Sequence, residues 1–473
     1  MNKAIVCIKA IAVLTAIFSL SACATNVPNN SHQASAGANT MKKASYPSVS
    51  FMVLSDTHLY DSSLGTSGAA WNAYMAKDRK LLKNSEETLK EVIAKITSAK
   101  PDFVLITGDL TKDGECQCHQ LFAKYLSEIE AAGIKCYVLP GNHDINNPAA
   151  KRFLPSGSTE SIPNISAEEF ASIYKADGYG DAVYRDPASL SYVASPVPGL
   201  WVLMLDSARY EHNARLKESV TSGAIREQTY RWIEERLREA TAKGIAVIAA
   251  EHHPLMEHFA GMKSKYPEYI VNDNWRLAGL LASYNVSLFF SGHYHASSIV
   301  MHHWDDKAPA GLAGKYIVDV ETGSLVTWPC TFRSVTLSPS GLVSIATSRI
   351  DQLPSYAAAG KSFDSEGKRI IEEGISTIAK ATMKKDFVPQ YDIDRITPQI
   401  TAAMMAHYAG DAQFQGNEMI AHTGLSFMGS MVVASYGTFI KGLWKTTEPH
   451  DVQLMEDNNL TIEPDGFWTK TAQ

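Results

Sequence analysis

Acidic, amide and imidazole side chains recur in short clusters over the first 300 residues of the chain. These clusters are Asp56 and His58, Asp109, Asn142-His143-Asp144, His252-His253, and His293 with His295. Two carboxylates, one amide oxygen and three or four imidazoles suit a pair of borderline divalent metal ions, and Asp109 is placed to bridge them. The residue types therefore predict a centre of two metals.

Short apolar, β-branched runs of the kind that form buried strands precede these clusters. The expected strands are Phe51–Leu54, Phe103–Ile106, Cys136–Leu139, Trp201–Leu205, Ile245–Ala249 and Val286–Phe290. Helices are expected between Asn84 and Pro101, where Asn84 and Glu87 are spaced as a capping box, and over Cys118–Ala131, Glu227–Ala242 and Trp275–Tyr284. The alternation predicts an α/β fold, in which the carboxyl ends of strands meet at one edge of a sheet.

Each motif alone has an ordinary structural explanation, because a histidine after a strand is more often a hydrogen-bonded residue than a ligand. The ordered series D-x-H, G-D, G-N-H-D, H-x-P and G-H-x-H favours a metal site, and it resembles the calcineurin-like metallophosphoesterase superfamily from Phe51 to Ile350. The resemblance implies one metal held by Asp56, His58, Asp109 and His295, and a second held by Asp109, Asn142, His252 and His293. His252 matches the H-x-P position, and the adjacent His253 is the alternative.

The same resemblance implies a four-layer αββα sandwich of two sheets between helices, with residues 316–350 closing the second sheet. More narrowly, the chain resembles bacterial secreted cyclic-nucleotide phosphodiesterases of class III that carry a C-terminal helical domain. The segments 141–148 (GNHDINNP), 190–192 (LSY) and 203–207 (LMLDS) and the helical tail carry this likeness. It implies a phosphodiesterase of small phosphodiesters such as cyclic nucleotides. A phosphomonoesterase, a lipid-headgroup phosphoesterase and a non-catalytic surface-binding lipoprotein are the alternatives.

The expected mechanism follows from the charge of the substrate. Two divalent ions, with iron, manganese and zinc as the open choices, would neutralise a phosphodiester and clamp it. Water bound to them would become hydroxide near neutral pH and serve as the nucleophile. His143 has no ligand role in the resemblance, so it is the candidate general acid, and Asp144 is the candidate to orient it.

The charge balance supports metals as the source of positive charge. The chain has 43 Lys and Arg against 50 Asp and Glu, for a net charge of -7. A protein that binds nucleic-acid duplexes by neutralising phosphates needs a clustered excess of basic residues, so we expect no such partner.

The N-terminal segment has the features of an export signal. Lys3 and Lys9 flank an apolar run that leads to Leu20-Ser21-Ala22-Cys23, which resembles the lipobox of bacterial lipoproteins. Residues 1–22 are therefore the expected signal peptide, Cys23 the lipidation site, and residues 23–50 a flexible tether. The protein would be exported and lipid-anchored at the bacterial cell envelope. A soluble secreted protein cut near Ala24 is the alternative.

The remainder of the chain divides into an expected catalytic domain, residues 51–350, and a mainly helical C-terminal domain, residues 351–473. Helices are expected over Glu366–Thr382, Ile396–Ala409 and Leu425–Leu443. The third of these segments is apolar, but it has enough polar residues to favour a buried core helix over a membrane span. The domain could cap the active site or mediate self-association.

Two further features allow more than one interpretation. Tyr60, Trp71 and Tyr74, in an insertion over 60–80, could stack on a base or simply fasten a long loop. Of the cysteines beyond Cys23, either Cys116 or Cys118 is expected to pair with Cys136, and Cys330 is a candidate free thiol.

Overall fold

The structure is a computed structural model, and it describes residues 43–412, 423–445, 448–449 and 451–471. The expected signal peptide, the lipidation site Cys23 and most of the tether lie outside these residues. Among the described residues, no helix is both long and apolar enough to cross a membrane. The apolar segment near residue 430 forms α13 (Phe427–Leu443).

Seven strands form the first sheet, in the order β17-β16-β14-β13-β1-β2-β3. Their bounds are β17 (Trp468–Lys470), β16 (Asn459–Ile462), β14 (Val343–Arg349), β13 (Thr331–Leu337), β1 (Val49–Leu54), β2 (Phe103–Ile106) and β3 (Lys135–Val138). Strands β1, β2 and β3 are parallel, whereas β13 is antiparallel to β1. The three parallel strands therefore end at the same edge.

Eight strands form the second sheet, in the order β15-β11-β12-β10-β9-β8-β7-β6. Their bounds are β15 (Gln453–Leu454), β11 (Ser298–His303), β12 (Tyr316–Glu321), β10 (Leu288–Ser291), β9 (Ala246–Glu251), β8 (Leu200–Leu205), β7 (Tyr192–Val197) and β6 (Tyr184–Arg185). The central strands β8, β9, β10 and β12 are parallel. A separate hairpin pairs β4 (Lys151–Phe153) with β5 (Thr159–Ser161).

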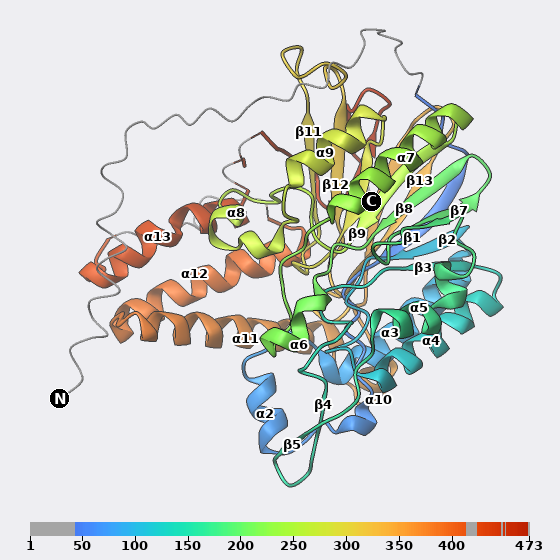
Figure 1. Cartoon of the computed structure of the whole chain (residues 1–473). Coiled ribbons are helices and arrows are strands. Elements are labelled where there is room, and N and C mark those ends of the chain that lie inside the picture. Colours follow the sequence, from blue (N-terminus) through green and yellow to red (C-terminus); the bar gives the residue numbers. More distant parts are fainter. Residues whose placement is uncertain (1–42, 413–422, 446–447, 450, 472–473) are drawn as a thin grey trace. The chain divides into compact units, whose positions relative to one another are not determined.

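Helices cover the outer faces of the two sheets, as Figure 1 shows. The helices before residue 350 are α2 (Ala69–Met75), α3 (Ser85–Ala99), α4 (Cys116–Ala131), α5 (Ala167–Ile173), α6 (Asn213–Leu216), α7 (Glu227–Lys243), α8 (Met262–Lys265) and α9 (Asn274–Ser283). Helix α4 packs against β3, α7 against β9, and α9 against β12. Between the sheets, the ring of Phe51 on β1 meets that of Phe290 on β10 at 5.4 Å. The expected four-layer αββα sandwich is confirmed.

The segment after residue 350 is mainly helical, as expected, and comprises α10 (Pro354–Ala358), α11 (Phe363–Lys385), α12 (Gln390–Ala409) and α13. Helix α12 packs against both α11 and α13. The chain then returns to the sandwich, where β15 joins the second sheet and β16 and β17 extend the first. The sequence did not predict these three short strands.

Two expectations, about strand pairing and a helix cap, are corrected. Within residues 316–350, only β12 joins the second sheet, because β13 and β14 pair with β1 in the first. Asn84 makes no side-chain cap on α3, and the Glu87 carboxylate instead accepts hydrogen bonds from the backbone N–H (2.7 Å) and hydroxyl (2.5 Å) of Ser355.

The expected disulfide is also absent from the described residues, since Cys116, Cys118, Cys136 and Cys330 are all free thiols. Cys118 and Cys136 belong to different apolar clusters, whereas Cys116 packs against the same cluster as Cys136 and is still a free thiol. The Cys118 Sγ accepts a hydrogen bond from the backbone N–H of Asp61 at 3.4 Å.

Candidate metal centre

The residues of the candidate centre lie in loops that follow five strands. Asp56 and His58 follow β1, Asp109 follows β2, Asn142 follows β3, His252 follows β9, and His293 and His295 follow β10. Because β1–β3 are parallel in one sheet and β9 and β10 are parallel in the other, both sheets deliver these loops to one place. The structure brings all seven predicted ligands together.

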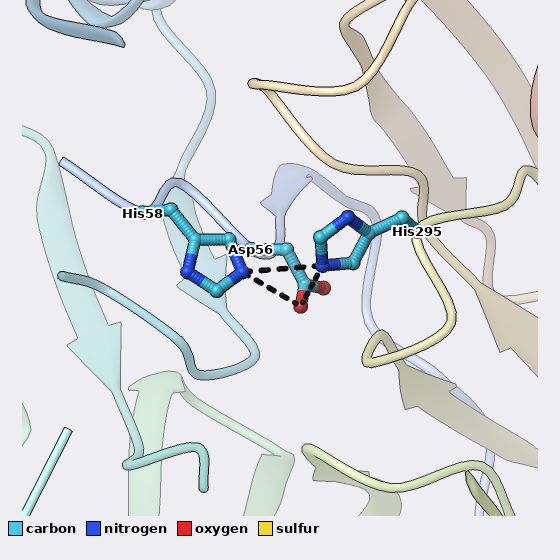
Figure 2. Close-up of side chains that lie close together, drawn as sticks. All are labelled: Asp56, His58 and His295. Atoms are coloured by element: carbon cyan, nitrogen blue, oxygen red, sulfur yellow. Dashed lines mark hydrogen bonds and ion pairs between the residues drawn. The ribbon is translucent and has the colours of Figure 1, made fainter. Parts of the chain in front are cut away.

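The first group of ligands consists of Asp56, His58 and His295. In Figure 2 the two imidazoles flank the Asp56 carboxylate and point their Nε2 atoms toward it. The Nε2 atoms lie 3.1 Å apart, and Asp56 Oδ1 is 3.3 Å from that of His295 and 3.8 Å from that of His58. All three atoms therefore surround one point that a metal ion could occupy.

The second group consists of Asp109, His252 and His293, with Asn142 beside it. His252 Nε2 lies 3.4 Å from Asp109 Oδ2, 3.1 Å from His293 Nδ1 and 3.2 Å from Asn142 Oδ1. The same Oδ2 atom of Asp109 is 3.6 Å from His58 Nε2 in the first group. A single carboxylate oxygen thus lies between the two groups, as a bridging ligand requires.

The hydrogen bonds of the two carboxylates fit metal binding. Asp56 Oδ2 accepts from the Ser55 hydroxyl at 2.5 Å and from the His293 N–H at 2.9 Å, whereas its buried Oδ1 has no hydrogen-bond partner among the described residues. Asp109 Oδ1 accepts from the His143 N–H at 2.8 Å, which leaves Oδ2 directed at the histidines. Each carboxylate is therefore held by one oxygen and presents the other to the centre.

The outer nitrogens of the histidines are also occupied. His252 Nδ1 contacts the Thr107 carbonyl oxygen at 2.8 Å, His295 Nδ1 contacts the Thr327 hydroxyl at 2.8 Å, and His293 Nε2 contacts the Glu268 carbonyl oxygen at 3.3 Å. Such partners fix the orientation and tautomer of metal-binding imidazoles. The residues present therefore fit two divalent ions.

Five of these ligands have backbone angles that non-glycine residues rarely adopt. The φ values are 49° at Asp56, 36° at His58, 50° at Asp109, 75° at His293 and 67° at His295. Strain of this kind costs about 1–3 kcal/mol per residue and concentrates at functional sites. The neighbouring glycines leave no room for a side chain, since a Cβ on Gly141 would lie 2.2 Å from Asp109 Oδ1.

His143 points into the site from the loop after β3, and its orienting partner is Asp113. His143 Nδ1 lies 3.0 Å from Asp113 Oδ1, and His143 Nε2 lies 4.0 Å from Asp109 Oδ2. Burial and the charge of Lys80 disfavour the imidazolium, but the charge of Asp109 and the hydrogen bond to Asp113 outweigh them, so the pKa of His143 is raised. A raised pKa suits a group that must deliver a proton.

Asp144 does not contact the His143 imidazole, so the expected orienting role is corrected. Its carboxylate accepts hydrogen bonds from the backbone N–H groups of Gly141 (2.9 Å), Leu110 (3.1 Å) and Thr111 (3.0 Å). Asp144 thereby ties the loop after β3 to the loop that carries Asp109. Asp113 was not predicted from the sequence. Its signal there is an acidic residue four positions after Asp109.

His253, the alternative ligand, lies beside the second group, with its ring 4.4 Å from that of His293, but its nitrogens bond elsewhere. Its Nδ1 lies 2.8 Å from the Ser207 hydroxyl and its Nε2 lies 2.8 Å from the Thr221 carbonyl oxygen. Both ring nitrogens are therefore occupied by the protein, and His252 takes the position beside Asp109.

A cavity of about 340 Å³ opens over the metal groups. Its lining combines the ligands with basic residues from the end of the insertion, with tyrosines, and with side chains of α11 and α12. The residues beyond the ligands and His143 include Lys77, Arg79, Lys80, Tyr266, Tyr269, Tyr294, Ile378, Met404 and Tyr408. The C-terminal helices thus form one wall of the cavity.

The three basic residues of this lining, Lys77, Arg79 and Lys80, were not predicted from the sequence, although the segment 77–80 (KDRK) is visibly basic. Lys80 Nζ lies 3.5 Å from His58 Nδ1, and Arg79 donates from Nη1 to the Tyr408 hydroxyl oxygen at 2.9 Å. The aromatic residues earlier in the insertion are instead structural. Trp71 is buried and packs against Tyr60, Tyr74 and Phe153, which fastens the loop.

Comparisons with known proteins agree with this geometry. The calcineurin-like phosphoesterase family model matches residues 49–297, more than half of the chain. A 3',5'-cyclic adenosine monophosphate phosphodiesterase, CpdA, of Vibrio vulnificus is 30% identical over 109 residues, or 23% of this chain and 34% of that protein. A probable cyclic nucleotide phosphodiesterase of Rhodococcus erythropolis is 25% identical over 263 residues, or 55% of this chain and 69% of that protein.

Among solved structures, a dimetal phosphatase from Danio rerio aligns with a TM-score of 0.43 and 16% identity, covering 64% of this chain and 96% of its own. The chain spans about a third of the length of the Vibrio relative.

Proposed function

Because the chain belongs to the calcineurin-like phosphoesterase family, we propose that it is a metal-dependent phosphodiesterase that hydrolyses small phosphodiesters, with cyclic nucleotides the first class to test. The observation that carries this proposal is the position of Asp109 Oδ2, 3.6 Å from His58 Nε2 and 3.4 Å from His252 Nε2. No predicted ligand is missing from the two groups, which argues against a purely binding role.

When bound, two divalent ions at these groups would neutralise the phosphate and activate water as the nucleophile. The side chains of the chain supply the rest. His143 is placed to give a proton to the departing alkoxide, and Asp113 holds its ring in place. Arg79 and Lys80 line the cavity and would attract an anionic substrate.

The extent of the cavity supports a diester over a monoester. Beyond the metal groups it continues to a wall formed by Tyr266, Tyr269, Tyr294 and Tyr408, which offers ring faces and hydroxyl groups to a second ester substituent. The names of the Vibrio and Rhodococcus relatives point to cyclic nucleotides as one such class.

A panel of substrates with the metal-loaded full chain tests the proposal. We expect faster hydrolysis of bis-(p-nitrophenyl) phosphate than of p-nitrophenyl phosphate, and measurable hydrolysis of 2′,3′- or 3′,5′-cyclic nucleotides. The His143→Ala variant serves as the control for contaminating phosphatases. Faster turnover of the monoester would overturn the choice of phosphodiesterase.

We also propose that the protein is exported and lipid-anchored through Cys23 at the bacterial cell envelope, on the strength of the lipobox-like segment 20–23. Mass spectrometry of the protein from a membrane fraction is expected to find a diacylglycerol-modified Cys23 as the N-terminal residue. A soluble product that begins near Ala24 would refute the anchor.

A further inference from the structure

A second cavity, of about 120 Å³, lies among helices α11, α12 and α13. It shares four lining residues with the cavity over the metal groups, namely Arg79, Tyr266, Ile378 and Met404. The two cavities are therefore neighbours along one wall. We propose that the second cavity is a binding subsite for an alkyl or acyl chain carried by one ester group of the substrate, an inference that rests on the proposed phosphodiesterase function.

The lining of this subsite favours a hydrocarbon. Arg79 lies at the junction of the two cavities. Among the other described lining residues, the hydrogen-bonding side-chain groups are the hydroxyls of two tyrosines and of Thr382. A nucleobase brings several ring and exocyclic polar atoms, and burying them without partners costs free energy. An alkyl chain needs none of these partners and gains from leaving water.

The size of the cavity supports the same conclusion. A single water needs roughly 10–15 Å³ of such space and two to four polar partners. The 120 Å³ of this cavity exceeds that several-fold, and its walls include aliphatic side chains such as Ala379 and Val432. An alkyl chain in this space would contact these aliphatic walls and leave water.

The arrangement of charge fits an amphiphilic phosphodiester. The metal groups lie at one end, the aliphatic cavity at the other, and Arg79 lines both. The Arg79 guanidinium is held by its 2.9 Å hydrogen bond to the Tyr408 hydroxyl of α12. A phosphate at the metals would therefore direct an apolar substituent past Arg79 into the helices.

The test is a series of p-nitrophenyl alkyl phosphates with methyl, butyl and octyl groups, hydrolysed by the Mn²⁺-loaded full chain. Hydrolysis breaks the bond between phosphorus and the p-nitrophenyl oxygen and gives the alkyl phosphate and p-nitrophenolate. Because each buried methylene group contributes about fourfold, we expect kcat/KM to rise at least about tenfold from methyl to octyl. Equal kcat/KM across the series would overturn the subsite.

A matched pair of variants on α11 locates the effect. Ala379 lines the cavity, whereas Ala381, two residues further on, is exposed. Ala379→Trp should reduce the octyl-to-methyl ratio of kcat/KM to about one, because the indole fills the cavity, and Ala381→Trp should keep the ratio of the wild-type protein. An equal fall of the ratio in both variants would overturn the proposed location.

Calorimetric binding of methylphosphonate and octylphosphonate, below the micelle concentration, separates this proposal from the proposed function. Tighter binding of octylphosphonate by at least about tenfold is expected even if no diester is hydrolysed. Absence of any turnover together with this preference would refute the phosphodiesterase and keep the subsite. Equal binding of the two phosphonates would refute the subsite whatever the turnover.

Discussion

His143 Nδ1 lies 3.0 Å from Asp113 Oδ1, and the other oxygen of Asp113 pairs with the buried ammonium group of Lys112. Lys112 in turn contacts Glu115 at 3.1 Å. The His143 ring is therefore held from behind by a buried network of charges while its Nε2 faces the metal groups. Such a pair fixes both the direction and the tautomer of an imidazole.

This pairing predicts how variants of the two residues behave. His143→Ala should lower the turnover of a diester roughly 10²–10⁴-fold, because the leaving group loses its proton donor. Asp113→Asn should lower it roughly 10–100-fold, because the His143 imidazole stays in the site but loses the carboxylate that fixes its direction and tautomer. Since Asp113 acts through His143, the double variant should be no slower than His143→Ala alone.

Metal analysis accompanies these rates and should find two equivalents of metal in every variant. Loss of metal in step with activity would make His143 a ligand instead of an acid. Full turnover of Asp113→Asn would contradict the orienting role.

Asp109 gives a second prediction, because its Oδ2 atom lies between the two ligand groups. Asp109→Asn should reduce the bound metal from two equivalents to at most one and should abolish turnover, since an amide is a weaker ligand than a carboxylate. Elemental analysis after dialysis measures the metal content. The exposed His303 provides a matched control, and His303→Gln should retain both metals. Two metals in Asp109→Asn would exclude a bridging role.

The sequence predicted the strands and the ligands for a shared physical reason. Each predicted strand is a short apolar run whose end is marked by a polar cluster, and β1, β2 and β10 begin or end within two residues of the expected positions. Because parallel strands end at the same edge of a sheet, local patterns at residues 56, 109 and 293 were sufficient to predict that these distant ligands meet at one site.

Features that depend on long-range contacts could not be predicted in this way. Strands β15 and β17 have only two and three residues, too few to show an alternating pattern. The contact of Arg79 with Tyr408 joins residues 329 positions apart, and no local pattern in either segment predicts a contact with the other. Asp113 and Asp144 are similar acids near His143 in the sequence, and only their three-dimensional positions assign one to the ring and the other to backbone N–H groups.

The contact between Arg79 and Tyr408 gives a third prediction, which concerns substrate binding. Arg79→Gln should lower kcat/KM for a diester roughly 10–100-fold, because a charge-assisted hydrogen bond to the phosphate is lost. Tyr408→Phe should raise KM only about 2–10-fold and leave kcat nearly unchanged, since it removes one hydrogen bond that positions the guanidinium. Steady-state kinetics separates the two parameters. A fall in kcat without a change in KM in both variants would place Arg79 outside substrate binding.

Asp177 gives a prediction about stability and pH, away from the metal groups. It lies in a short helical turn (Lys175–Tyr179), is buried, and its Oδ1 has no hydrogen-bond partner among the described residues. Burial, together with the charge of Glu130, raises the pKa of Asp177 to about 7. The folded state therefore prefers the protonated acid, whereas the unfolded chain ionises near pH 4.

The contribution of Asp177 to the stability of the wild-type protein should consequently fall as the pH rises from about 4 to about 7, because the folded state must then bury a charge that the unfolded state exposes to water. Asp177→Asn removes that charge, so the free energy of unfolding of this variant relative to the wild-type protein should increase over this range by roughly 2–4 kcal/mol and level off above it.

Thermal and urea unfolding at pH 4.5 and 8 measure the change. Asp181→Asn, which alters an exposed ion pair with Lys135, is the control and should change stability by less than about 1 kcal/mol at either pH. An equal difference between Asp177→Asn and the wild-type protein at both pH values would show that Asp177 is not protonated in the folded state.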